Sequence, residues 1–223
     1  MLDSPVFTVT TPAANAAARR LTTAAKVQAV LFGGATTDTA LLEALIDRVS
    51  AAAATYCNLA RDANGTPLTF GREVCRATWR PGWTARTGSL MMPWRYPITA
   101  IGSVVADGVT LVSADYGMRD ANLERLDSEG ALIAWPAAGI VVDFTAGWDL
   151  TSQDTTPPDI EAAVIDQVKT MYLGRQRDPA LRSETTESVG SATYSVAGGD
   201  SIGRSGLLLS VEAAFDGLRA VPV

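Results

Sequence analysis

The sequence contains no histidine, and this absence removes a large set of catalytic and metal-binding arrangements. Histidine is the base of Ser-His-Asp sites and the commonest metal ligand in proteins. The two cysteines, Cys57 and Cys75, cannot complete a tetrahedral zinc site by themselves. Because no export signal is visible, we predict that both cysteines are reduced packing residues.

Long apolar runs and basic clusters are also missing. No apolar stretch reaches the roughly 20 residues that a membrane span needs, and the opening MLDSPVFTVTTPA lacks the basic and apolar regions of a signal peptide. We therefore expect no membrane association and a cytoplasmic location. Lys and Arg number 18 against 24 Asp and Glu, a net charge of −6. Since duplex-binding domains carry a basic surface patch, high affinity for nucleic acid is not expected.

Motifs for phosphate binding or nucleophilic catalysis are absent as well. The sequence has no GxxxxGK[ST], no GxGxxG and no GxSxG pattern. The stretch Asp62–Gly65 (DANG) lacks the later ligands of a calcium loop, and we predict a plain turn there. We expect solvated turn residues, not an acid–base pair, at Asp107, Asp115, Asp120, Glu124, Asp127, Glu129 and Asp143. The chain is predicted to be no enzyme, with no cofactor and no metal.

Three helices are indicated by apolar residues at helical spacing. The first runs over Thr23–Phe32, with Val27, Val30 and Leu31 on one face. The second and clearest runs over Asp38–Cys57, with Asp38 as its cap. The third runs over Pro158–Leu173, because proline suits the first helical position.

Between the second and third helices the residue composition is typical of β-strands. Phe70–Trp148 is rich in Val, Ile, Thr and aromatic residues, with Gly and Pro between the runs. Asp107-Gly108 separates two apolar runs and predicts a hairpin with a type I′ turn. A strand-rich segment between two helices predicts an all-β insertion within a helical module.

The last forty residues differ again. Arg182–Gly206 is rich in Ser, Thr and Gly around a short β-like ATYSV, and Leu207–Arg219 reads as a short amphipathic helix. One interpretation is a flexible arm with an adhesive element. The other is a surface loop followed by a helix that completes the core of the same chain.

These observations predict an α+β protein: a small bundle of three to four helices, an inserted all-β lobe and an extended C-terminal arm. The expected parts are an N-terminal helical part at 1–58, the β lobe at 59–150, a completing helix at 151–181 and the arm with a short terminal helix at 182–223. On the second helix, Glu43 and Asp47 are like charges at i, i+4, which is unfavourable in isolation. They form either a solvated face or a face toward a channel or a neighbouring subunit.

The order of segments resembles a known family. The motifs are LTTAAKVQAVLFGG and DTALLEALIDRVSAAAATYC, then MPWRYPITAIGSVVADG, then IVVDFTAGW followed by PPDIEAAVIDQVKTMYLGR. This arrangement is similar to the head–tail connector proteins (adaptor or neck proteins) of long-tailed bacteriophages and gene transfer particles, over about Leu21–Arg219. The exit from the first helix, LFGGATTDTA, departs from the family pattern.

The resemblance implies a structural virion protein at the neck, the head–tail interface. Such proteins form a ring, commonly twelvefold, that docks under the portal, extends the DNA channel and presents a surface to a downstream stopper or tail component. Genomic DNA would pass through without specific binding. The alternatives are a related neck or tail-completion protein, either a stopper or a tail terminator, and a small-ligand or enzyme module. In this reading the arm docks on the portal through Tyr194, Val196, Leu208, Val211, Phe215 and Leu218.

Overall fold

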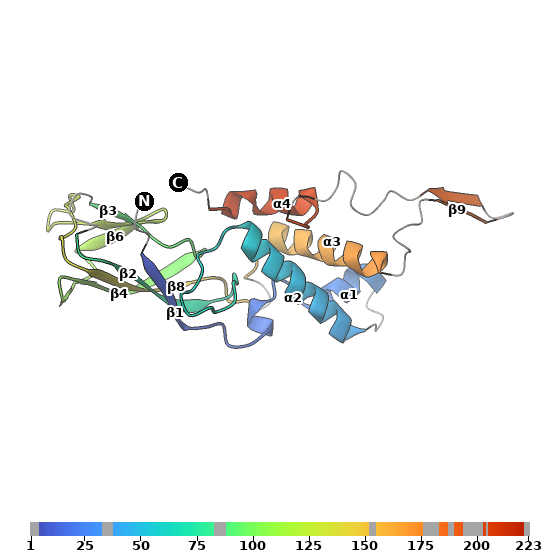
Figure 1. Cartoon of the computed structure of the whole chain (residues 1–223), viewed down its shortest axis with the longest axis horizontal. Coiled ribbons are helices and arrows are strands. Elements are labelled where there is room, and N and C mark those ends of the chain that lie inside the picture. The colour runs from blue at the N-terminus through green and yellow to red at the C-terminus, as the bar shows by residue number, and fades with distance from the viewer. Residues whose placement is uncertain are drawn as a thin grey trace. The chain divides into compact units, whose positions relative to one another are not determined.

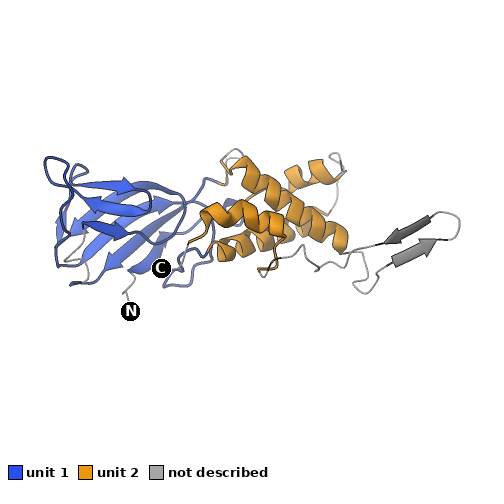
Figure 2. Ribbon diagram, turned by 90° about the horizontal axis from the view of Figure 1, so that it is seen from above, with its two compact units in different colours: residues 1–18, 58–149, 222 blue, residues 19–57, 150–221, 223 orange. Residues whose placement is uncertain are grey.

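The chain folds into two compact units in the computed structural model, which describes residues 5–32, 38–82, 88–151, 155–175, 183–186, 190–193, 203 and 205–220. Met1–Ala18 and Asn58–Asp149 form the first, here called the β unit. Arg19–Cys57 and Leu150–Val221 form the second, the helical unit. Figure 2 shows the two units in blue and orange. The predicted α+β class is confirmed, with four α-helices and three antiparallel sheets of five, three and two strands in the described part.

The helical unit contains α1 (Ala24–Phe32), α2 (Thr39–Tyr56), α3 (Pro158–Gly174) and α4 (Leu209–Phe215), and α2, α3 and α4 pack on one another (Figure 1). The three predicted helices therefore begin and end within one residue of their observed bounds. Two short 3-10 helices, η1 (Ala17–Arg19) and η2 (Asp216–Leu218), precede α1 and follow α4.

Local chemistry explains the helix starts and the buried faces. Asp38 caps α2 by accepting a hydrogen bond from Leu41 N at 3.0 Å. Pro158 opens α3, where its missing N–H costs nothing. The apolar stripes of the two helices are buried, and their members are Leu42, Ile46, Val49, Ala53, Ile160, Val164 and Val168.

One member of the face predicted for α1 lies outside the core. Val27 is fully buried, but the Val30 side chain is 54% exposed. At about 100° per residue, Val30 lies roughly 60° around the helix from Val27, whereas Leu31 lies roughly 40° from it. In a short helix that presents a narrow face, Val30 therefore falls at the solvent edge.

The β unit holds a five-stranded sheet in the order β1-β2-β8-β4-β5 and a three-stranded sheet in the order β3-β7-β6. The strands are β1 (Val6–Thr11), β2 (Glu73–Trp79), β3 (Ser89–Met91), β4 (Ile98–Ala106), β5 (Val109–Thr110), β6 (Tyr116–Arg119), β7 (Asn122–Arg125) and β8 (Ile140–Ala146). Alternate residues of β2 and β8 are buried, as period-2 patterning requires. They join residues of β1, β3 and β7 in one core.

A strand precedes the first helix, which the sequence analysis did not predict. β1 pairs antiparallel with β2, for example Phe7 with Ala77 and Val9 with Cys75. Phe7 and Val9 point into the core of the β unit. The segment 1–58 is therefore not wholly helical, because its first strand completes the sheet of the following part.

The predicted hairpin is confirmed. Asp107 and Gly108 have φ values of 54° and 73°, the left-handed pair that a type I′ turn requires. They join β4 to β5, with Ala106 opposite Val109.

A further short strand pair lies in the C-terminal part. β9 (Ser183–Thr186) and β10 (Gly190–Thr193) pair antiparallel with each other, in a sheet separate from the other two.

The turn at Asp62–Gly65 is confirmed, but Asp62 has a structural role that was not predicted. Its buried carboxylate accepts hydrogen bonds from Val9 N at 2.9 Å and Thr66 N at 3.0 Å. Burial alone would raise the pKa of Asp62, but the hydrogen bonds from Thr66, Val9 and Asn64 outweigh it and lower the pKa to about 2. Asp62 thus ties β1 to the chain that leads into β2.

We predict that Asp62→Ala lowers the free energy of unfolding by about 1–3 kcal/mol at neutral pH, because two N–H groups lose their acceptor. The folded pKa, about 2, lies below the ordinary 3.8, so the carboxylate's contribution is complete above pH 3.8 and is lost as the pH falls toward 2. Urea denaturation across this range measures the difference from wild type. Glu129→Ala, in an exposed turn, is the control, and an equal loss in both variants would contradict the assignment.

Candidate functional site

Among the described residues, no group of three or more His, Cys, Asp or Glu side chains is arranged to hold a metal ion. Cys57 and Cys75 are free and buried, as predicted. Burial raises the pKa of each thiol to about 12, so neither forms an appreciable thiolate at neutral pH. No described helix is long and apolar enough to cross a membrane.

Asp143 was predicted to be a solvated turn residue, and this was wrong. It lies in β8 and pairs with Arg76 of β2, with Nε–Oδ1 at 2.7 Å and Nη2–Oδ2 at 3.0 Å. Ser103 of β4 donates to the same carboxylate at 3.1 Å. The Arg76 hydrogen bond holds the pKa of Asp143 below its ordinary value. Three neighbouring strands are thereby linked on one face of the sheet, which is a structural role.

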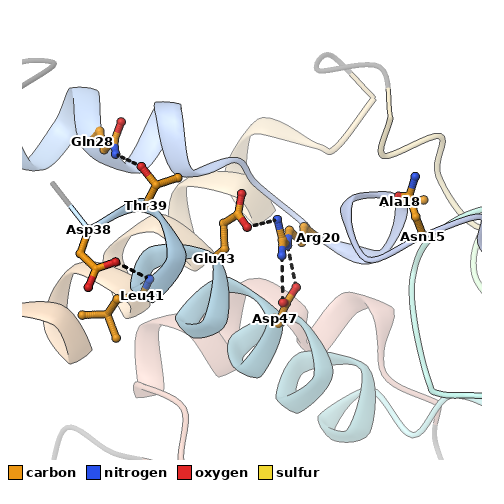
Figure 3. Close-up of polar contacts among 9 residues, drawn as sticks. All are labelled: Asn15, Ala18, Arg20, Gln28, Asp38, Thr39, Leu41, Glu43 and Asp47. Atoms are coloured by element: carbon orange, nitrogen blue, oxygen red, sulfur yellow. Dashed lines mark hydrogen bonds and ion pairs between the residues drawn. The ribbon is translucent and has the colours of Figure 1, made fainter. Parts of the chain in front are cut away.

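Glu43 and Asp47, the predicted channel or inter-subunit residues, share one arginine of the same unit. Arg20 precedes α1 and binds Asp47 through Nε at 2.7 Å and Nη2 at 3.0 Å, and its Nη1 lies 3.1 Å from Glu43 Oε2 (Figure 3). The arginine side chain is 16% exposed, whereas the two carboxylates are 42% and 44% exposed. The unfavourable i, i+4 pair on α2 is therefore compensated within the chain.

A second ionic contact joins the start of α1 to α3. Lys26 Nζ lies 2.9 and 2.8 Å from the two carboxylate oxygens of Glu161, and Thr22 Oγ1 donates to the same group at 3.1 Å. Together with Arg20, this contact ties the segment between η1 and α1 to both long helices.

The residues predicted to dock on a portal are in different environments. Tyr194 and Val196 lie outside the described residues. Val211 and Phe215 are fully buried in the helical unit, while Leu208 and Leu218 are half-buried. Val211 and Phe215 cannot contact another subunit unless α4 leaves its place, so the interpretation of α4 as a core helix is correct for these two residues.

Polar contacts hold both ends of α4. At its start, Leu208 N donates to the buried side chain of Gln167 in α3 at 2.7 Å. At its end, Tyr56 of α2 donates to the carboxylate of Asp216, and this hydrogen bond raises the pKa of Tyr56 to about 12. Neither contact was visible in the sequence, because the partners are far apart along the chain.

Comparison with known proteins identifies a fold. No family model and no curated protein matches the chain. It is similar to a chain from the neck of an empty gene transfer agent (GTA) particle computed with C6 symmetry: 17% identity, 97% of this chain, 96% of that chain, TM-score 0.55. Chains from the neck of a native GTA particle computed with C12 symmetry and from the native GTA virion have 17% and 18% identity, cover the same shares and give TM-scores of 0.49. At such identity, the first match shows a common fold.

We predict a measurable coupling between Arg20 and Asp47. A double-mutant cycle with Arg20→Gln and Asp47→Asn should give about 0.5–1 kcal/mol at low salt, since the carboxylate is partly exposed. The coupling should fall in about 1 M salt, where charges are screened within a few ångströms. Arg20→Gln combined with Asp166→Asn should be additive, and a salt-independent coupling would argue against the ion pair.

We also predict that α4 contributes to the stability of the helical unit. Phe215→Ala should lower the free energy of unfolding by about 3–5 kcal/mol, because it leaves a cavity at a fully buried position. Leu209→Ala, at a side chain 50% exposed in the same helix, should change it by less than about 1 kcal/mol. Chemical denaturation followed by circular dichroism compares the two. Equal effects would mean that α4 does not pack as described.

Proposed function

We propose that this chain is a structural component of the neck of a phage-like particle, an adaptor that docks under the portal. The observation that supports the proposal is the likeness to a GTA neck chain over 97% of this chain and 96% of that one. The covered part includes residues of both units, so the likeness is not confined to one of them. The family resemblance of the sequence motifs supports the same function independently of the structure.

The proposed assembly is a ring. The similar chain comes from the neck of an empty GTA particle computed with C6 symmetry, and this rotational symmetry supports the proposal of a ring. A contact between two different surfaces of identical chains closes into a ring when its rotation divides a full turn. By the family resemblance, we propose twelve copies, with the portal on one side and a stopper or tail component on the other.

The charge of the chain suits a DNA channel. A net charge of −6 per copy, repeated around a ring, disfavours lasting contacts with phosphates. A polyanion then passes the wall without being held. Genomic DNA is therefore a transient occupant of the proposed ring, not a ligand, and the role needs no catalysis, cofactor or metal.

For the portal contact, we propose Tyr194 and Val196 in the chain between α3 and α4, together with Leu208 directly before α4 and Leu218 in η2 after it. The burial of Val211 and Phe215 removes them from this set. An extended segment with alternating apolar residues can add to a strand edge on a partner, with main-chain hydrogen bonds providing affinity.

The test uses the full chain with the portal protein of its particle. Tyr194→Ser combined with Val196→Ser should abolish portal binding in co-purification, with the thermal unfolding midpoint unchanged. The matched control, Tyr194→Phe with Val196→Ile, keeps the apolar character and should bind as wild type does.

Electron microscopy of the particles then decides the location. The expected result is a ring of this chain directly under the portal, with DNA passing through it in filled particles. A position further down the neck would identify a stopper, and one at the tail tube a tail terminator. Either would overturn the adaptor assignment, as would equal portal binding by the polar and conservative variants.

A further inference from the structure

The two outer edges of the five-stranded sheet differ in how their main-chain groups are covered. At the β1 edge, Val9 N donates to the Asp62 carboxylate at 2.9 Å, and Phe7 O accepts from Ala63 N at 2.9 Å. The turn at 62–63 therefore satisfies groups that face away from β2. This edge is closed to another strand.

The opposite edge is formed mainly by β4, and among the described residues only the C-terminal end of β4 has a strand on its outer side. Val105 and Ala106 pair with β5, and Val104 O accepts from Leu111 N at 2.9 Å. Along Ile98–Ser103, the described residues place no second strand beside β4. The outward N–H and C=O groups of this stretch form a template for strand addition.

The sequence of the open stretch carries few of the usual protections. Ile98–Ala106 (ITAIGSVVA) contains no charged residue and no proline, and Thr99, Ala100 and Gly102 are exposed. The register against β8 is irregular between Ile98 and Ala100 and again between Ile101 and Ser103. Such bulges shorten the regular ladder, so the edge suits a short strand rather than a long one.

The same chain carries a short strand pair that has no third strand among the described residues. β9 and β10, of four residues each, pair with each other and belong to neither larger sheet. A two-stranded hairpin by itself is marginally stable in water, and a third strand would stabilise it. β10 (GSAT) is uncharged, whereas β9 (SETT) contains Glu184, so β10 matches the uncharged edge better.

We propose that β10 of one copy adds to the open edge of β4, at Ile98–Ser103, in a second copy. Main-chain hydrogen bonds provide the affinity of such a contact. Donor and acceptor are different surfaces, so the contact is heterologous and each copy can give one strand and receive one. This contact would be the one that joins neighbouring copies in the proposed ring. Only the closure into a ring rests on the proposed function, because strand addition between two copies can be measured in solution.

Mixed single-cysteine copies test the contact. Cys57 and Cys75 are buried and free, so we expect the cysteines introduced at the proposed contact to be the ones that react. Copies with Ala100→Cys and copies with Ala192→Cys are mixed at the highest soluble concentration and treated with a short bis-maleimide, which tolerates an unknown register. We expect a covalent heterodimer, several-fold more abundant than in the control mixture of Ala131→Cys with Ala192→Cys, since Ala131 is exposed and belongs to no strand.

Equal yields in the two mixtures, or no heterodimer in either, would overturn the proposal. A double variant that crosslinks only within one chain, at a yield independent of dilution, would overturn it as well. Unchanged circular dichroism and thermal midpoints confirm that each variant folds. Failure of this test leaves the neck assignment standing, because that assignment is decided by portal binding and particle imaging.

Discussion

One buried guanidinium holds four segments of the β unit together. Arg95 Nη2 lies 3.4 Å from Glu73 Oε2 at the start of β2, and both side chains are 2% exposed. Its Nη1 donates to Thr69 O at 3.3 Å, and the group lies over the Phe7 ring of β1 at 5.4 Å from the centroid. Removing one partner of such a pair costs about 3–5 kcal/mol, because a buried charge is left uncompensated. The packing of β1 on the sheet and the position of the segment that leads into β4 therefore depend on the same ion pair.

The sequence could predict the elements whose signals are local. The stripe of α2, the cap at Asp38 and the turn at Asp107-Gly108 each depend on residues a few places apart. β1 also had a local signal, since Phe7 and Val9 alternate with threonines, yet its place in the sheet depends on β2, more than sixty residues later. The Arg95–Glu73 pair had no signal, because nothing in a sequence says which two of many charges are buried together.

Sequence patterns also failed to identify the partners of the candidate site residues, because those partners lie far away along the chain. Periodicity showed that Val211 and Phe215 share a face, and that the face is apolar, but amphipathic spacing cannot say whether the covering surface belongs to the same chain. Similarly, Glu43 and Asp47 were recognised as an unfavourable pair, whereas the compensating Arg20 lies beyond a helix and a turn. Both questions were about partners, and in both cases the structure shows a partner within the helical unit. Whether Glu43 and Asp47 also face a channel or a neighbouring subunit stays a prediction.

The fixed position of α4 changes how the chain between α3 and α4 can bind a partner. That chain starts at the end of α3, and Gln167 of α3 holds its other end at Leu208, so it is tied to the bundle at both ends. The hydrogen bond from Tyr56 to Asp216 holds the far end of α4. Tying both ends removes conformations before any partner arrives, as loop closure does. Less entropy is then lost on ordering, so a modest interface suffices for binding. In the proposed ring, every copy presents this segment from the same place on its bundle, so contacts with the proposed symmetric partner can form together and reinforce one another.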